Sequence, residues 1–197
     1  MPRIDISENL VHFTRDDSID KAFDRLRAIL RDQHLIAGNR YIRGGHTCVC
    51  FSEAPLHALQ DGLVNPDYYS SYSPFGIMVS KKWLFSQGGR PVVYQSDAEY
   101  ESLPDVLKWR HVRYEPNSEP SVDFTWEREW RIRTEALRFG PDTAAIVVQD
   151  QSWAQRLVQE HEIEQDYEIQ LYSLVLDEQI ARLMLETPFQ WRIVTLR

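Results

Sequence analysis

Short segments of alternating or continuous apolar residues recur along the chain and predict β-strands. In residues 10–14, Val11 and Phe13 fall on one face of an extended chain, while His12 and Thr14 fall on the other. Similar segments predict further strands at residues 47–51, 75–80, 91–95, 124–133, 143–149, 167–176 and 189–196. The pattern indicates a protein built largely around β-structure with a buried face.

Apolar residues at helical spacing predict one long early helix and several shorter ones. The early helix begins after N-cap candidates at residues 16–18, and Gly38 is its expected stop; its apolar positions are Ile19, Ala22, Phe23, Leu26, Ile29 and Leu30. Further helical segments are expected at residues 56–63, in parts of 97–113, at 152–162 and, for a turn or two, at 177–185. Residues 65–74 form an aromatic-rich loop, which either folds back over the core or presents rings to a partner.

The order of these elements indicates the fold class. Strands and helices do not alternate regularly, and no glycine-rich nucleotide fingerprint follows any strand. The 197 residues show no repeat or long linker. The sequence therefore predicts a single α+β domain over residues 1–197, with a mixed or split sheet flanked by helices.

Composition and charge exclude some classes of protein. The 30 acidic residues outnumber the 22 lysines and arginines, for a net charge of −8, so general affinity for nucleic acid is not expected of the chain as a whole. No apolar run approaches the roughly 20 residues of a membrane span, and the N-terminal residues lack the apolar segment of a secretory signal. The only cysteines, Cys48 and Cys50, lie too close together for a structural disulfide. We expect a reduced, cytoplasmic protein without a membrane anchor.

The segment from Trp126 to Arg133 is the strongest candidate for chemistry. As a strand it places Glu127, Glu129, Arg131 and Arg133 on one face, which is either an ion-pair ladder or the polar wall of a site. His12 and Tyr94 are ambiguous in the same way, since each residue type is often structural. The three positions become informative in their chain order: a strand with His-x-Thr before a helix, a middle strand ending in Tyr, and a late strand with Glu-x-Glu.

That order resembles the ADP-ribosyltransferase superfamily, and the opening Val11-His12-Phe13-Thr14 with its following helix resembles the bacterial DNA-targeting toxins of that superfamily. The segments 50–55 and 127–131 also resemble AbiGi-like abortive-infection proteins. The chain departs from the pattern after the first helix, where Gly38 comes late, and in a loose spacing to Tyr94. The resemblance implies an ADP-ribosyltransferase-like fold that uses NAD as a substrate and transfers ADP-ribose to a nucleic acid or protein. It also implies a toxin or phage-defence setting, with a cognate antitoxin or toxin as partner.

The resemblance further implies a role for individual residues. Glu129 matches the carboxylate that stabilises an oxocarbenium-like ribose, and Glu127 would orient or activate the acceptor. His12 and Thr14 would bind the adenosine-side ribose, and Tyr94 would stack on nicotinamide. The pyrophosphate would meet Arg43 or Arg15, between which spacing does not choose.

The sequence gives weaker support for a metal site or a cysteine nucleophile. His46, Cys48, Cys50 and His57 are metal-ligand types, but their spacing lacks the second pair of a zinc site, so no metal is expected. A Cys50–His57 nucleophile pair would need an exposed, activated thiolate in apolar surroundings.

The remaining alternative is a catalytically silent binding or immunity module that retains the fold. The two hypotheses differ in whether Glu129 and His12 face one pocket. If either side chain is turned outward, or is locked in a salt bridge with Arg131 or Arg133, the enzyme hypothesis fails and the silent module is favoured.

Overall fold

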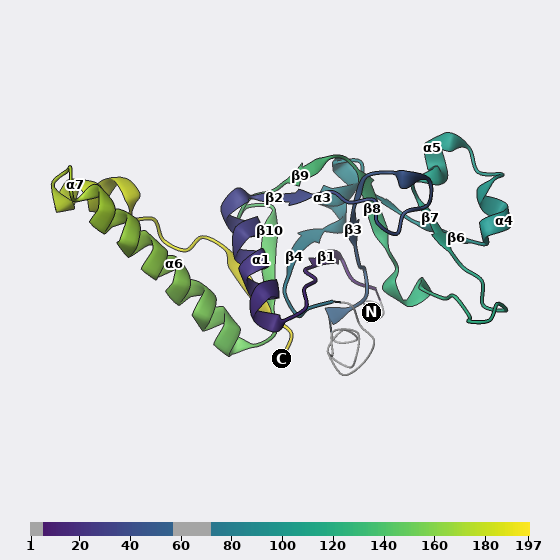
Figure 1. The fold of residues 1–197 in the computed structure, drawn as a ribbon, viewed down its shortest axis with the longest axis horizontal. Helices are drawn as coiled ribbons and strands as arrows, with labels where there is room; N and C mark the ends of the chain where they lie inside the picture. The colour runs from purple at the N-terminus through teal and green to yellow at the C-terminus, as the bar shows by residue number, and fades with distance from the viewer. Residues whose placement is uncertain (1–5, 57–71) are drawn as a thin grey trace.

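A computed structural model describes residues 6–56 and 72–197 of the chain (Figure 1). The expected helix at 56–63 and most of the aromatic loop at 65–74, with His57, lie outside these residues. A four-stranded mixed sheet forms the centre, in the order β1, β4, β10, β11. These strands are β1 (Asn9–Phe13), β4 (Gly76–Ser80), β10 (Ala144–Val148) and β11 (Arg192–Thr195). β10 runs parallel to β11, and the other pairs are antiparallel. Continuous apolar runs make β4 and β10 almost wholly buried.

A second, three-stranded antiparallel sheet carries the candidate chemistry. It comprises β3 (Cys48–Phe51), β8 (Trp130–Arg133) and β5 (Arg90–Pro91), with β8 in the middle. A bridge between Val11 and Ser52, with hydrogen bonds of 2.9 and 2.8 Å, holds β1 beside the end of β3. The two sheets therefore form a split arrangement, and the predicted α+β class is confirmed.

The strand predicted over residues 124–133 is wrong in its first half. Residues Thr125–Glu127 form a 3₁₀ turn, η3, and Arg128 follows with a φ of 45° in the left-handed region. The carbonyl of Glu127 is held by the hydroxyl of Ser52 (2.9 Å) and the amide of Glu53 (3.2 Å), so this turn is anchored to β3. Glu127 and Glu129 consequently do not share a strand face by alternation, because the strand begins only at Trp130.

Two helices cover one face of the central sheet. α1 (Ile19–Asp32) begins at Ser18, whose side chain accepts from the amide of Lys21, and ends at Gln33 rather than at the expected Gly38, because Gln33 takes up the left-handed conformation. Phe23 and Leu26 of α1 pack with Leu157 of α6 on the sheet residues of the main core. A smaller apolar cluster, which includes Val11 and Val147, covers the opposite face.

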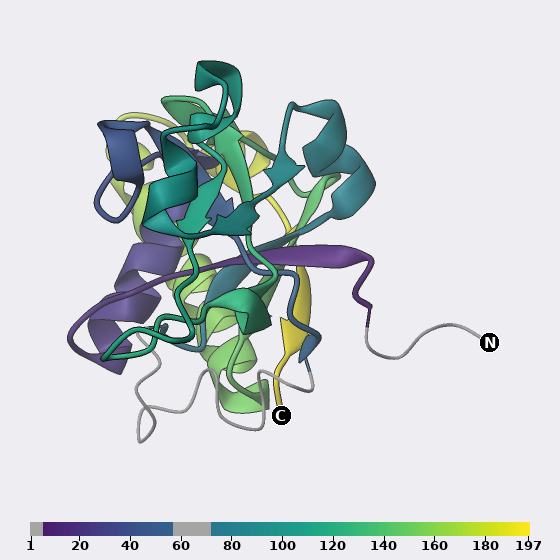
Figure 2. The ribbon, with the colours of Figure 1, turned by 90° about the vertical axis from the view of Figure 1, so that its right-hand side faces the viewer.

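The C-terminal part of the chain forms a helical hairpin. α6 (Gln151–Tyr172) continues ten residues past the expected end at 162, and α7 (Glu178–Leu185) packs against it. The strand predicted at residues 167–176 is therefore wrong. Its alternating apolar residues also satisfy helical spacing, and the helix already begun at Asp150 propagates through them. Figure 1 shows the hairpin extending away from the sheets, and Figure 2 views the molecule from the opposite end.

The remaining elements are short. Two small sheets are formed by β2 (His34–Ile36) with β9 (Ala136–Arg138) and by β6 (Val93–Gln95) with β7 (His111–Arg113), the second pair parallel. The short helices are η1 (Arg43–Gly45), α3 (Lys81–Ser86), α4 (Asp97–Tyr100) and α5 (Asp105–Lys108). No helix among the described residues is long and apolar enough to span a membrane.

Candidate functional site

His12 is fixed on β1 where the two sheets meet. Its Nδ1 donates to the carbonyl of Cys50 at 2.8 Å, and its ring meets Phe51 edge to face, with centroids 5.8 Å apart. Burial lowers the pKa of His12, so the ring is neutral at neutral pH. With the proton on Nδ1, the Nε2 atom presents a lone pair, and no described residue donates to it. His12 is therefore set up to accept a hydrogen bond from a hydroxyl.

Thr14 is committed to the fold. Its side chain is 2% exposed, and its hydroxyl donates to the carbonyl of Phe75 at 3.1 Å. The amide of Thr14 donates to the same carbonyl at 2.7 Å. The hydroxyl thus fastens the end of β1 to the start of β4, and its predicted role at the ribose remains a prediction.

Glu129 forms a two-pronged ion pair with Arg131. The Nε–Oε1 distance is 2.8 Å and the Nη2–Oε2 distance 3.2 Å, and both side chains are almost fully buried. Arg131 also donates from Nη1 to the carbonyls of Trp109 (3.1 Å) and His111 (2.8 Å). This is the salt bridge that speaks for the silent module, and it fixes the Glu129 carboxylate in one orientation.

Tyr94 and Cys50 complete the surroundings of Glu129. The hydroxyl of Tyr94 accepts from the amide of Glu129 at 2.9 Å, and burial raises the pKa of Tyr94 to about 12. Burial, followed by the negative charge of Glu129, raises the pKa of Cys50 well above its ordinary value. Cys50 is therefore a protonated thiol, which opposes a nucleophilic role.

Glu127 differs from Glu129 although it lies only two residues away. It sits half-buried at the end of η3 and accepts a hydrogen bond from the Tyr72 hydroxyl at 3.2 Å. Burial, followed by the charge of Glu129, raises the pKa of Glu127 to about 7, while Arg131 and Arg15 act in the opposite direction. Glu127 therefore exchanges a proton near neutral pH.

The two arginines predicted as candidates for the pyrophosphate, Arg43 and Arg15, have different surroundings. Arg43 pairs with Asp97 (2.5 Å) and Glu101 (2.9 Å) and lies over the ring of Tyr100, 4.2 Å from its centroid, so its guanidinium is engaged at α4. Arg15 instead exerts its charge on Glu127.

Sequence reasoning missed two members of this cluster, Tyr72 and Cys50, and the neighbouring Glu53. Tyr72 belongs to the aromatic-rich segment, which gave no sign of its carboxylate partner. Cys50 was considered only as a buried residue, a metal ligand or a nucleophile paired with His57.

Glu53 follows Ser52, and both residues hold the carbonyl of Glu127 in the 3₁₀ turn. The Glu53 carboxylate accepts hydrogen bonds from Lys81 (2.6 Å) and Trp130 (2.8 Å). The sequence offered one indication of this contact: the polar residues Ser52 and Glu53 directly follow the apolar strand β3, which pairs with β8. We call His12, Cys50, Tyr72, Tyr94, Glu127, Glu129 and Arg131 the carboxylate site.

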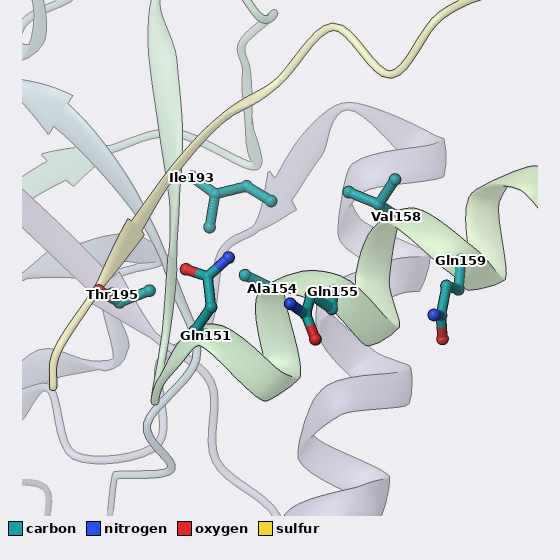
Figure 3. Close-up of a pocket in the computed structure, with 7 residues that line it drawn as sticks. All are labelled: Gln151, Ala154, Gln155, Val158, Gln159, Ile193 and Thr195. Carbon is teal, nitrogen blue, oxygen red and sulfur yellow. The ribbon is translucent and has the colours of Figure 1, made fainter.

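Two hollows in the described surface lie away from the carboxylate site. One, of about 540 Å³, lies between α6 and β11 and is lined by residues such as Gln151, Gln155 and Ile193, none of them titratable (Figure 3). The other, of about 430 Å³, lies between β4 and residues 141–144. Within residues 6–56 and 72–197, no three His, Cys, Asp or Glu side chains gather as a metal site. The chemistry of the side chains, and not these hollows, identifies the candidate site.

No protein-family model matches the chain, and a search of curated proteins finds no match. Among solved structures, the chain is similar to Thermus sp. 2.9 DarT in complex with NAD+, with 13% sequence identity and a TM-score of 0.41. The match covers 98% of this chain and 95% of that one. A likeness this distant assigns no function, so the proposal below rests on the residues of the carboxylate site.

Proposed function

We propose that the carboxylate site cleaves the nicotinamide–ribose bond of NAD and transfers ADP-ribose to a macromolecular acceptor, a nucleic acid or a protein. The observation that supports this is the pair Glu127 and Glu129, two neighbouring carboxyl groups held in different environments. One is fixed by Arg131, and the other has a pKa raised to about 7. Carboxyl pairs of this kind divide charge stabilisation and proton transfer between them in glycosidic cleavage.

The geometry suggests a role for each group. As the C1′–N bond breaks, nicotinamide leaves with the bonding electrons, and the positive charge develops on the ribose, where the fixed Glu129 carboxylate stabilises it. The acceptor then attacks C1′ and loses a proton, which Glu127 takes in its ionised form. The free Nε2 of His12 accepts a hydrogen bond from a ribose hydroxyl. Tyr94 supports the amide of Glu129 through its hydroxyl, which leaves its ring available for the predicted stacking on nicotinamide.

A second candidate has its own supporting observation. The ion pair with Arg131 offsets the negative charge of Glu129, and a carboxylate so neutralised stabilises a cationic ribose less well. This favours a binding or immunity module that retains the site as a structural network.

Titration calorimetry with NAD tests the binding half of the proposal. His12→Ala should weaken NAD binding about tenfold, because one hydrogen bond is lost. His34→Ala is the matched control, because His34 is also half-buried and also meets a backbone carbonyl through Nδ1 at 2.8 Å, on the separate strand β2. Absence of heat at millimolar NAD would overturn the proposal in favour of the silent module.

Nicotinamide release tests the chemical half. Glu129→Gln and Glu127→Gln should each retain NAD binding and lower the rate of release, by a factor on the order of 100 or more. Normal binding with equal, background release in all three proteins would show that the site binds NAD without catalysis. Such a result would leave the chain a nucleotide-binding module.

A further inference from the structure

Three contacts fix Tyr72 beside the carboxylate site. Its ring lies against Phe13 of β1, with centroids 5.9 Å apart, and packs on the smaller apolar cluster. The next residue, Ser73, donates its amide to the carbonyl of Thr14 at 2.9 Å. The Tyr72 hydroxyl donates to Oε1 of Glu127 at 3.2 Å. The ring and the adjoining backbone are thus anchored to the end of β1, and they present the hydroxyl to Glu127 from a fixed support.

The direction of this hydrogen bond determines which form of Glu127 it favours. Burial, followed by the charges of Glu127 and Glu129, raises the pKa of Tyr72, so the phenol keeps its proton at neutral pH and acts as the donor. A donor stabilises a carboxylate more than a neutral carboxyl group, so this contact lowers the pKa of Glu127. Burial of Glu127 has the larger effect and raises the same pKa to about 7. Tyr72 therefore opposes the effect of burial.

Charged side chains from two other segments also act on Glu127. The negative charge of Glu129 raises its pKa, while Arg131 and Arg15 lower it. Arg131 is paired with Glu129 itself, so the two charges largely offset each other at Glu127. Of the three groups that favour the ionised carboxylate, Tyr72 has the largest effect, ahead of both arginines. Its hydroxyl is thus a principal control on the ionisation of Glu127.

We propose that Tyr72 is a positioning residue for Glu127, which directs the Glu127 carboxylate and keeps a larger share of it ionised at neutral pH. The inference rests on the proposed function, in which ionised Glu127 takes the proton that the acceptor loses as it bonds to C1′. In that step the proton passes from the acceptor to the Glu127 carboxylate, and Tyr72 keeps its own proton throughout. Tyr72 acts through Glu127 and needs no contact with the substrate.

An NMR titration of Glu127 tests the proposal without substrate. The full chain carries glutamate labelled with ¹³C at the side-chain carboxyl, and Glu127→Gln identifies the resonance. Tyr72→Phe removes the hydroxyl and keeps the ring that packs on Phe13. It should raise the titration midpoint of Glu127 from about pH 7 by roughly one pH unit, because one hydrogen bond to the charged form is lost.

Tyr114→Phe is the matched control for this titration. Tyr114 is also half-buried, lies just after β7, and has a hydroxyl to which no described residue bonds. The control should leave the midpoint of Glu127 where it is in the unmodified chain. A midpoint that Tyr72→Phe does not move would overturn the proposal.

The pH dependence of nicotinamide release from NAD, with water as the acceptor, tests the consequence for catalysis. In Tyr72→Phe the acidic limb of the profile should move to higher pH by the same amount, which lowers the rate roughly fivefold at pH 7 and restores it toward pH 9. A rate lowered by one factor at every pH would indicate a merely structural role and overturn the proposal. If the unmodified chain releases no nicotinamide, the proposed function fails, while a shifted NMR midpoint still shows that Tyr72 controls the ionisation of Glu127.

Discussion

The carboxylate site and the α6–α7 hairpin depart from the usual distribution of residues in opposite directions. At the start of β8 the Glu129 carboxylate and the Arg131 guanidinium are buried together, with Arg131 only 4% exposed. On the hairpin, leucines such as Leu183, 87% exposed, face outward. The first region places charge inside the protein, and the second places apolar surface outside it.

The two regions differ in whether the chain satisfies them itself. Each prong of Arg131 has an acceptor within the chain, so the buried charge of Glu129 is fully paired. The hairpin leucines have no comparable cover among the described residues. A buried charge that is paired within the chain stabilises the fold, whereas an exposed apolar side chain contributes little to it.

The largest predicted effect tests the internal pairing. Arg131→Met should lower the free energy of unfolding by about 3–5 kcal/mol, because it leaves the buried Glu129 carboxylate without its counter-charge. Arg133→Met, at the exposed last residue of the same strand, is the control and should change it by less than about 0.5 kcal/mol. Urea unfolding measures both. Similar small losses in the two proteins would show that Glu129 does not depend on Arg131.

A second prediction concerns the base of the hairpin. Leu157 of α6 is 3% exposed and belongs to the main core. Leu157→Ala should therefore lower the free energy of unfolding by about 2–4 kcal/mol through lost burial and a residual cavity. Urea unfolding again gives the value. A loss below about 1 kcal/mol would mean that α6 is not held to the sheet by this contact.

A third prediction uses the raised pKa of Glu127. In the folded protein this carboxyl holds its proton up to about pH 7, whereas its ordinary pKa is 4.5. The resulting stabilisation is fully present below pH 4.5 and is lost as the pH rises through 7. Between pH 5 and 8 the free energy of unfolding should thus fall by roughly 2 kcal/mol more in the unmodified chain than in Glu127→Gln, after allowance for partial exposure. Parallel pH curves for the two proteins would contradict the raised pKa.

Much of the fold was predictable because burial leaves a direct trace in the sequence. The apolar runs of β4 and β10 and the helical spacing of α1 place these elements correctly. The strand at 167–176 failed because its alternating apolar residues fit either period, and only the helix preceding them decides between the two. Local pattern alone does not contain that information.

For the candidate site, the sequence indicated residues better than their geometry. It proposed His12, Tyr94, Glu127 and Glu129, and the structure places the Tyr94 hydroxyl against the amide of Glu129. The sequence did not reveal the turn at Arg128, which separates the two glutamates, or the contact of Glu127 with Tyr72. Both depend on pairing between segments that are far apart in the chain, and periodicity does not record such pairing.

The smallest predicted effect completes the comparison within one hairpin. Leu183→Ala repeats the substitution made at Leu157, but at a side chain that is 87% exposed. Little apolar area leaves water on folding at this position, so the free energy of unfolding should change by less than about 0.5 kcal/mol. A loss approaching that of Leu157→Ala would show that Leu183 is buried in the folded protein, by this chain or by a second copy. Unfolding measured at two protein concentrations separates these cases, because only a second copy makes the loss depend on concentration. A negligible loss would show that Leu183 contributes little to the stability of the fold.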